Sequence, residues 1–203
     1  KGKTTYAMEG SIFIAGAGVQ WLRDKLNFFK NASETENIVK SLKDNKGVYL
    51  VPAFTGLGAP YWDANARGVL SGLTRDTGPK EIIRATIESV AYQTYDLFEA
   101  MKHDGLRPRL VKVDGGMVMN NWFSQFLSNV VDIKVLRPKV QETTALGAAF
   151  MAGLQIGVYK SLKDISKNWQ LDKNFTPKIN SKERNNLVKG WSAAIKKTLT
   201  KTI

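Results

Sequence analysis

The sequence contains no cysteine and a single histidine, and these two scarcities exclude several kinds of site. Without cysteine there is neither a disulfide framework nor a thiolate metal centre. With one imidazole, a histidine-rich metal site or a Ser-His dyad is not easily assembled. His103 lies in a polar stretch of the kind that forms surface loops, so we expect it on the surface.

Long apolar runs are also missing. No stretch approaches the ~20 consecutive apolar residues of a transmembrane helix, and residues 1–10 do not resemble a signal peptide. The composition, with 43% hydrophobic and 24% charged residues, is that of a globular chain that buries its own core. We therefore expect a soluble, cytoplasmic protein with no membrane partner.

Acidic residues are too few to balance the basic ones, and the net charge is +12. Residues 162–203 hold ten lysines and arginines against three acidic residues, so most of the excess lies in the last quarter. A basic chain invites a nucleic-acid interpretation. The lysines of the last predicted helix, however, lie opposite its apolar residues, which favours a solvated helix face. We expect no nucleic-acid partner, and a non-catalytic basic binding module is the alternative from another class.

Short apolar runs alternate with longer amphipathic stretches, which predicts one α/β domain. A strand at 48–51 is expected to be covered on both faces, as in a parallel sheet. A long helix begins at Pro79, and a strand at 110–113 and a helix at 122–131 follow, which is the βαβ pattern of a parallel sheet with right-handed crossovers. We also expect a strand end at 6–8, a strand at 133–136, and helices at 12–29, 34–42, 142–154 and from Asn180.

Three segments carry narrower expectations. The helix at 142–154 is built of small residues, so it should lie close to a neighbour, with its N-terminal end beside Gly115-Gly116. In the long aromatic loop 53–72, Asp63 and Arg67 are four residues apart and are expected to pair. Whether that loop is structural or contacts a ligand stays open, since long loops often carry sites. Residues 157–180 are expected to be an irregular connection.

Two glycine-rich helix entries carry the strongest signals for a ligand. In one, Asp114-Gly115-Gly116 ends a strand and Asn120 or Asn121 can cap the next helix. In the other, the run Ala15-Gly16-Ala17-Gly18 is followed by Gln20 one turn on. Glycine lets a ligand approach the backbone, and free N–H groups at a helix start suit an anion or a polar ligand edge. Taken singly, the Asp114-Gly115-Gly116 run is better explained by a tight strand-to-helix turn that binds nothing, and the Ala15 to Gly18 run is explained equally well by plain helix-helix contact.

Several runs, taken together, point to one family. They are Tyr6-Ala7-Met8-Glu9-Gly10, Ala15-Gly16, Gln20-Trp21-Leu22-Arg23-Asp24, the stretch from Pro52 to Asp63, Ala66-Arg67-Gly68, Gly68 to Leu73 with Glu81-Ile82 and Ala85 to Glu88, Val113 to Gly116 with Asn120-Asn121, and Glu142 to Ala149. This pattern resembles the FGGY family of carbohydrate kinases, and within it the glycerol kinases. The resemblance extends over nearly the whole chain and is weakest at 28–46 and 157–180.

The resemblance implies an actin-like, ribonuclease-H-like ATPase domain with a mixed sheet flanked by helices. Such kinases have two of these domains around an active cleft, and residues 1–203 match the C-terminal, nucleotide-binding one, starting partway into it. The phosphate loop, the glycerol-binding residues, the catalytic Asp and the early strands of the sheet would then lie before Lys1. This part alone is expected to be inactive.

The implied reaction is transfer of the γ-phosphoryl of ATP to glycerol, with Mg²⁺, in a homodimer or higher oligomer. The positions that match the family's nucleotide contacts are Gly16, Gln20, Gly116 and Asn120. Met117 and Met119 depart from the family, whose members often have small residues there. No catalytic residue and no direct metal ligand is expected in this chain. Asp114 is either an outer group for Mg²⁺ or a turn residue bonded to its own backbone. Another FGGY sugar or polyol kinase is the alternative.

Overall fold

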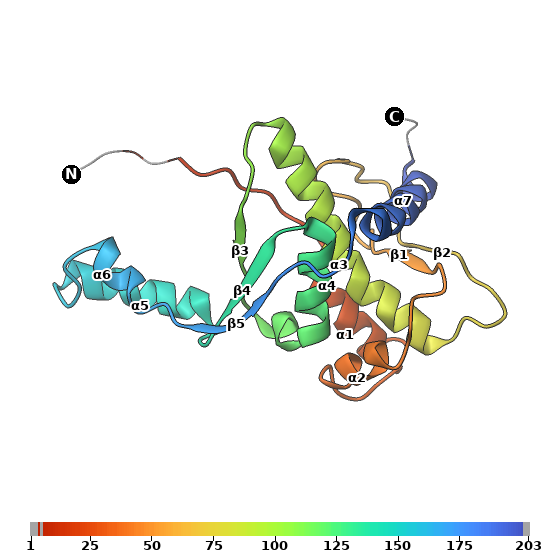
Figure 1. The fold of residues 1–203 in the computed structure, drawn as a ribbon, viewed down its shortest axis with the longest axis horizontal. Coiled ribbons are helices and arrows are strands. Elements are labelled where there is room, and N and C mark those ends of the chain that lie inside the picture. Colours follow the sequence, from red (N-terminus) through yellow and green to blue (C-terminus); the bar gives the residue numbers. More distant parts are fainter. Residues whose placement is uncertain (1–3, 5, 201–203) are drawn as a thin grey trace.

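The computed structural model describes residue 4 and residues 6–200, arranged as a main body and a projecting arm (Figure 1). The elements, in order, are α1 (Gly16–Asp24), α2 (Glu34–Lys40), β1 (Tyr49–Val51), β2 (Val69–Ser71), α3 (Pro79–His103), β3 (Leu110–Lys112), the 3-10 helix η1 (Gly116–Met119), α4 (Asn121–Val131), β4 (Lys134–Pro138), α5 (Thr143–Gln155), α6 (Leu162–Ser166), β5 (Leu171–Phe175) and α7 (Ser181–Thr198). None of the helices within the described residues is long and apolar enough to cross a membrane.

Helix α3 is the central element of the body. Pro79 opens it, and the Glu81 carboxylate accepts a 2.9 Å hydrogen bond from the backbone N–H of Gly78, which satisfies one of the free donors at the helix start. Residues 83–92 are all buried, so this half of the helix is enclosed on every side rather than along one stripe. Helices α1, α2 and α4 and strand β1 pack around it. His103, the last residue of α3, is exposed as predicted.

An aromatic cluster joins α3, α4 and α7. The Tyr92 ring stacks on Trp191 with centroids 5.3 Å apart and meets Phe126 edge-on at 5.6 Å. The predicted faces of α7 are confirmed: Trp191, Ala194 and Ile195 are buried, Leu187 and Leu199 are partly buried, and Lys189, Lys196 and Lys197 are exposed, while Lys201 lies outside the described residues. Asn180 caps α7 by accepting a 2.9 Å hydrogen bond from the backbone N–H of Glu183.

The strand at 48–51 is buried on both faces, as expected, but it does not belong to a parallel sheet. As β1 it pairs antiparallel with β2, with Tyr49 opposite Ser71 and Val51 opposite Val69. Helices α3 and α7 pack against it, so the burial of this strand comes from these helices and not from a place inside a parallel sheet. The parallel prediction is wrong because the loop at 53–68 turns the chain straight back onto the strand it has just left.

Strands β3, β4 and β5 form the second sheet, with β4 in the middle. β3 and β4 are parallel, with Val111 opposite Val135, and α4 is the crossover, so a βαβ unit is present but not with β1. β5 is antiparallel to β4, which makes the sheet mixed. The prediction of an irregular connection at 157–180 is therefore wrong, since it contains α6 and β5. The sequence of β5 is LDKNF, and Phe175 is the only buried residue of this described strand. It therefore lacks the alternation of apolar residues from which a strand could be predicted.

Two predictions at the N-terminal end are also wrong. No strand is found over the described part of 6–8, where Tyr6 is 90% exposed, because no other described strand lies beside it to complete a ladder. The helix expected at 12–29 is limited to Gly16–Asp24. Ala15, the residue before the helix, has a non-helical ψ of −105°, and Asn27 takes a positive φ of 54° just after the helix end.

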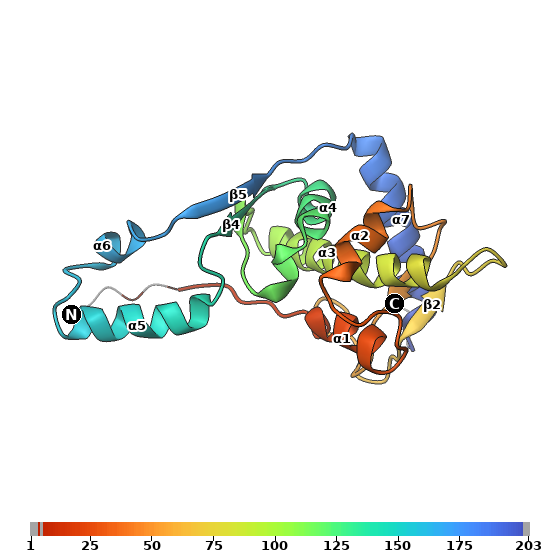
Figure 2. The same ribbon diagram turned by 90° about the horizontal axis from the view of Figure 1, so that it is seen from below.

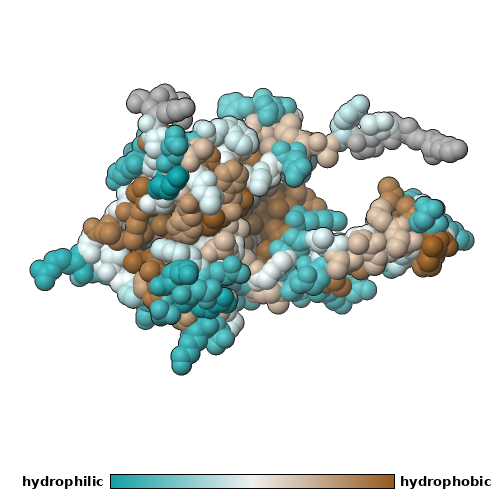
Figure 3. All heavy atoms as spheres, turned by 180° about the vertical axis from the view of Figure 1, so that it is seen from behind, coloured by the Kyte–Doolittle hydropathy of each residue, from teal (hydrophilic) through white to brown (hydrophobic). Residues whose placement is uncertain are grey.

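The arm consists of α5 and α6 and projects from the body in both ribbon views (Figures 1 and 2). Gly153 is the one buried residue among those described in α5, and the ring of Tyr159 covers it. The expectation that α5 packs closely on a neighbouring element is therefore wrong, since Tyr159 of the arm covers Gly153 while Ala145, Ala148, Ala149 and Ala152 are exposed. Its N-terminal end does lie beside the glycine turn, where the Gly115 N–H donates to the Gln141 carbonyl at 3.4 Å. Figure 3 shows apolar side chains gathered along the arm, where Met151, Ile156, Val158 and Leu162 are exposed.

The loop at 53–72 is held by Asp63, but not through Arg67. The Asp63 carboxylate accepts hydrogen bonds from the backbone N–H groups of Asn65 and Ala66 at 3.1 Å and from the backbone of Thr200 at 2.7 Å. Arg67 instead donates to backbone carbonyls of the loop, at 2.7 and 3.0 Å. The predicted Asp63–Arg67 pair is therefore wrong, because unpaired backbone groups of the loop and the C-terminal segment satisfy both side chains.

Candidate functional site

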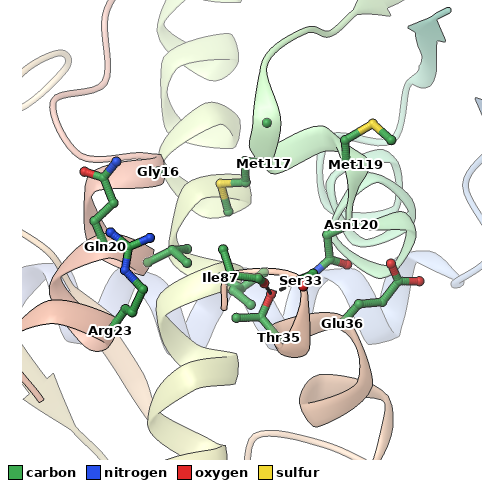
Figure 4. Close-up of a pocket in the computed structure, with 13 residues that line it drawn as sticks. Gly16, Gln20, Arg23, Ser33, Thr35, Glu36, Ile87, Met117, Met119 and Asn120 are labelled. Carbon is green, nitrogen blue, oxygen red and sulfur yellow. Dashed lines mark hydrogen bonds between the residues drawn. The ribbon is translucent and has the colours of Figure 1, made fainter. Parts of the chain in front are cut away.

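A pocket of about 450 Å³ opens between α1 on one side and α2, η1 and the start of α4 on the other (Figure 4). Its volume lies within the usual range for small-molecule sites, ~300–1,000 Å³. The residues that line it are Gly16, Val19, Gln20, Arg23, Ala32, Ser33, Thr35, Glu36, Ile87, Gly116, Met117, Met119 and Asn120. All four residues predicted to contact nucleotide are among them, although they come from two distant segments of the sequence. None of the lining residues comes from the loop at 53–72, which favours the structural reading of that loop.

Helix α1 forms one wall through Gly16, Gln20 and Arg23. A side chain at Gly16 would meet no atom within 4 Å, so the glycine leaves open space at the helix start. Gln20 is exposed and lies one turn further along the same face, next to Arg23 in Figure 4. The Arg23 guanidinium is paired with Asp24, with Nε 2.6 Å from one carboxylate oxygen and Nη2 3.0 Å from the other. The amide of Gln20 is thus the freer polar group on this wall.

The glycine turn after β3 forms the opposite wall. Gly115 takes a φ of 84°, which favours glycine, and it leads into η1. Gly116, the first residue of η1, has no atom within 4 Å of the place where a Cβ would be. Asn120 caps α4, because its Oδ1 accepts a 3.0 Å hydrogen bond from the backbone N–H of Phe123. Two helical elements therefore begin at this wall, and at the start of α4 the N–H groups of Asn121 and Phe123 are already bonded to Glu36 and Asn120.

Helix α2 supplies a third wall that the sequence did not reveal. The Asn120 Nδ2 donates to the Thr35 hydroxyl at 3.4 Å, and the Glu36 carboxylate accepts from the backbone N–H of Asn121 at 3.2 Å. Thr35 is almost fully buried, at 4% exposed. The sequence predicts a polar surface helix at 34–42 and does not show that it borders a ligand site. Its one local signal is the polar helix start from Ser33 to Glu36, which many surface helices share.

Glu36 remains ionised in spite of its position. Burial opposes its charge, but hydrogen bonds from Lys40 and Asn121 prevail and lower the pKa of its carboxyl below the usual value. The Lys40 ammonium is 2.5 Å from the carboxylate. The pocket therefore has an ion pair, Glu36 with Lys40, on its α2 side.

Apolar side chains complete the pocket. Ile87 of α3 lies at its base, and Val19 and Met117 lie on opposite walls. Met119 is 46% exposed at the rim. The arrangement offers a flat aromatic group an apolar slot with hydroxyl and amide groups around its edge, and it offers an anion the helix starts at the two glycines.

The described residues form no cluster of three or more His, Cys, Asp or Glu side chains that could hold a metal ion. Asp114 is exposed at the end of β3 and does not line the pocket. The donor set of these residues therefore does not make a complete site for Mg²⁺, which needs several oxygen ligands in an octahedron.

The known proteins that are similar to this chain belong to one family. A profile of the C-terminal domain of the FGGY family of carbohydrate kinases matches residues 1–156. The glycerol kinase of Alteromonas mediterranea is 55% identical over 194 residues, covering 96% of this chain and 39% of that protein. Glycerol kinase 1 of Pseudomonas aeruginosa is 54% identical over 196 residues, covering 97% and 40%. The chain thus spans about 40% of the length of the relatives it matches.

Solved structures agree. The crystal structure of Plasmodium falciparum glycerol kinase with ADP is similar with a TM-score of 0.85 and 35% identity, covering 95% of this chain and 38% of that one. A ligand-bound xylulose kinase from Lactobacillus acidophilus follows with a TM-score of 0.76 and 26% identity, covering 92% and 38%. The overlap with these sugar kinases confirms the predicted α/β fold of the actin-like ATPase type with a mixed sheet.

Proposed function

Because this chain belongs to the FGGY family of carbohydrate kinases, we propose that it is the C-terminal, adenine-nucleotide-binding domain of a glycerol kinase, a phosphotransferase with an alcohol acceptor. The proposal rests chiefly on one observation. Gly16 and Gln20 from α1, and Gly116 and Asn120 from the turn before α4, line a single pocket of suitable volume. The relatives named above and the similarity to a glycerol kinase solved with ADP support the choice of ligand.

In this proposal adenosine occupies the slot between the two glycines. The missing side chains at Gly16 and Gly116 let the ligand lie against the backbone. Gln20 offers a free amide to the polar edge of the ligand. Asn120 offers less, since its Oδ1 is used by the helix cap and its Nδ2 already has one partner in Thr35. We therefore assign Gln20 and the backbone of the glycine turn a larger share of the polar contacts than the Asn120 side chain.

The charges of the walls orient the ligand. The Glu36 carboxylate is paired with Lys40 and adds little net charge, so the N-terminal end of α1 beside Gly16 is the feature that favours the phosphates. Mg²⁺ would arrive with the nucleotide, since proteins usually hold it through substrate phosphates and one or two carboxylates. Asp114, which ends β3 just before the glycine turn, is the residue proposed to approach that ion as an outer group.

We assign the glycerol-binding site and the catalytic carboxylate to the part of a glycerol kinase that residues 1–203 do not cover. Phosphoryl transfer needs positioning, charge neutralisation and a carboxylate that accepts the hydroxyl proton. Of the carboxylates in the described residues, Glu36 lines the pocket, and it is engaged by Lys40 and Asn121. Glycerol is favoured over another sugar or polyol because relatives that cover nearly the whole chain at 51–55% identity are glycerol kinases, whereas the xylulose kinase is 26% identical.

The test is calorimetric titration of the 203-residue chain with ADP. Gly116→Val places a side chain where the nucleotide is proposed to lie, and the open space there lets the fold accept it. We expect the ADP dissociation constant to rise about tenfold or more, a loss of at least ~1.4 kcal/mol. Gly147→Val is the matched control, because Gly147 also has no atom within 4 Å but belongs to α5 in the arm. An unchanged dissociation constant for Gly116→Val would mean that the site is misplaced.

Three expectations from the sequence stay predictions. They are the cytoplasmic location, which we propose because ATP is the phosphoryl donor, the homodimer or higher oligomer, and the absence of a nucleic-acid partner. The exposure of Lys189, Lys196 and Lys197 on the outer face of α7 accords with a solvated face. Salt-sensitive DNA or RNA binding that depends on these lysines would support the basic binding module instead.

A further inference from the structure

Arg137 of β4 is buried behind the pocket, at 6% exposed, and does not line it. Its Nε forms a 2.7 Å ion pair with Asp172 of β5. The rest of its guanidinium turns away from the sheet toward the glycine turn. Nη1 donates to the carbonyls of Val118 and Met119 at 2.8 and 3.2 Å.

These two carbonyls belong to the last residues of η1. At the end of a helical turn the carbonyls lack partners within the helix, and their direction is set by what they meet outside it. A guanidinium is planar and presents several donors in fixed directions, so it holds two neighbouring carbonyls in one orientation. The peptide units that follow Val118 and Met119 are fixed with them, and these units lead directly into Asn120, which caps α4.

Arg137 also reaches the α2 wall of the pocket, through Asn121. The Asn121 Oδ1 accepts from Nη2 of Arg137 at 3.3 Å and from the Lys173 ammonium at 3.1 Å. With its oxygen held by two cations, the amide directs its Nδ2 to the Glu36 carboxylate, at 3.3 Å. A continuous set of contacts thus runs from β4 through Asn121 to α2.

From this geometry we propose that Arg137 is a positioning residue for the nucleotide. It fixes the C-terminal end of η1 on one wall and, through Asn121, holds the α2 wall at its distance from η1. This inference rests on the proposed function, since it assigns Arg137 an effect on the ligand of that same pocket. Arg137 does not itself line the pocket, so its effect on binding comes through the groups it orients, among them the carbonyl of the lining residue Met119.

The experiment compares ADP dissociation constants of the 203-residue chain and three variants, at a temperature where near-ultraviolet circular dichroism shows each to be folded. Arg137→Met removes every donor but keeps much of the apolar stem. We expect it to raise the dissociation constant about tenfold or more, because small misplacements of binding groups have large effects. Arg137→Lys keeps the charge and the pairing with Asp172, but one ammonium cannot hold both carbonyls and Asn121. We expect it to raise the constant by an intermediate factor, roughly threefold.

Arg184→Met is the matched control. The Arg184 guanidinium is 2.9 Å from Asp132, at the C-terminal end of the same helix α4. Its loss removes an arginine ion pair from the helix end that faces away from the pocket. We expect the ADP dissociation constant to stay within about twofold of that of the unchanged chain, even if the melting temperature falls.

The outcomes separate the inference from the proposed function. If the unchanged chain does not bind ADP, the proposed function fails. If it binds and a folded Arg137→Met binds equally well, the positioning role is overturned, and Arg137 only stabilises the fold. If Arg137→Met does not fold, the folded Arg137→Lys decides, and an unchanged dissociation constant for that variant overturns the inference. An equal weakening by Arg184→Met overturns it as well, because the effect would then follow from general loosening of α4.

Discussion

The indole Nε1 of Trp191 donates a 2.6 Å hydrogen bond to the carboxylate of Asp96, which lies in the second half of α3. The Tyr61 hydroxyl donates to the same oxygen at 2.8 Å, from the aromatic loop. One carboxylate therefore connects α7 and the aromatic loop to α3. Asp96 lies in the second half of α3, whereas Ile87, which lines the pocket, lies in the first half. The separation makes it possible to test the stability of the fold independently of nucleotide binding.

Trp191→Ala should lower the free energy of unfolding by about 3–5 kcal/mol, as for other large side chains removed from a core. Trp191 is completely buried, stacks on Tyr92, and supplies one of the hydrogen bonds to Asp96. Lys196→Ala, on the exposed face of the same helix, should change it by no more than about 0.5 kcal/mol. Urea unfolding of both variants measures the difference, and comparable losses would refute the assignment of the two faces of α7.

Asp96 should make stability depend on pH. Burial raises the pKa of its carboxyl to about 6, although the hydrogen bonds from Trp191 and Tyr61 favour the charged form. The folded state then holds a proton between about pH 4 and 6 that the unfolded state releases, so the contribution of Asp96 to stability is complete below that window and is lost as the pH rises through it.

Asp96→Asn isolates this effect, because an amide does not titrate. We expect the unfolding free energy of the variant, relative to the unchanged chain, to increase from pH 4 to 6 by an amount on the order of 3 kcal/mol, and to level off above pH 6. Urea unfolding at half-unit steps from pH 4 to 8 provides the measurement. If the two curves run parallel, Asp96 has an ordinary pKa in the folded chain.

Glu36→Gln should weaken nucleotide binding by loosening the α2 wall. The amide loses the charge that attracts Lys40, and one of its two terminal atoms can no longer accept from Asn121. We expect the ADP dissociation constant to rise about three- to tenfold, a change of roughly 0.7–1.4 kcal/mol. Glu99→Gln is the control, since Glu99 also pairs with a lysine on its own helix but lies outside the pocket. Equal effects of the two substitutions would contradict a role for α2 in the site.

The 203-residue chain by itself should not transfer phosphate at an appreciable rate. Positioning of both substrates supplies most of the catalysis in such reactions, and the pocket carboxylate Glu36 is engaged by Lys40 and Asn121. Production of glycerol 3-phosphate from ATP and glycerol is the assay, with and without the N-terminal part of a relative added in trans. Turnover by the chain alone at the rate of an intact relative would show that the residues doing the chemistry were misidentified.

Local chemistry explains which parts of the site the sequence could predict. Glycines at a strand end, an asparagine before a helix and an amide one turn after a small-residue run each leave a short-range pattern. These patterns marked the two glycine-rich helix entries, and the resemblance to the FGGY family selected Gly16, Gln20, Gly116 and Asn120, which the structure brings to one pocket. The start of α3 at Pro79 and the extent of α4, predicted at 122–131, also followed from local signals.

The missed parts depend on contacts between distant residues. Thr35 and Glu36 read as surface polar groups until α4 is placed beside α2. Arg137, which is followed by a proline, was recognised only as the end of a strand, because no nearby residue indicates that it contacts η1. β5 was missed for the same reason, because its four exposed residues carry no apolar alternation.

The contact between Asn121 and Glu36 joins residues 85 positions apart, and this has a consequence during synthesis on the ribosome. At the usual roughly 5–20 residues per second, the segment that follows α2 takes about 4–17 seconds to reach Asn121. For that time α1 and α2 have left the exit tunnel without the turn that completes their pocket. We therefore expect a nascent chain stalled before Asn121 not to bind nucleotide at the proposed site, and nucleotide to stabilise the fold only after α4 has emerged.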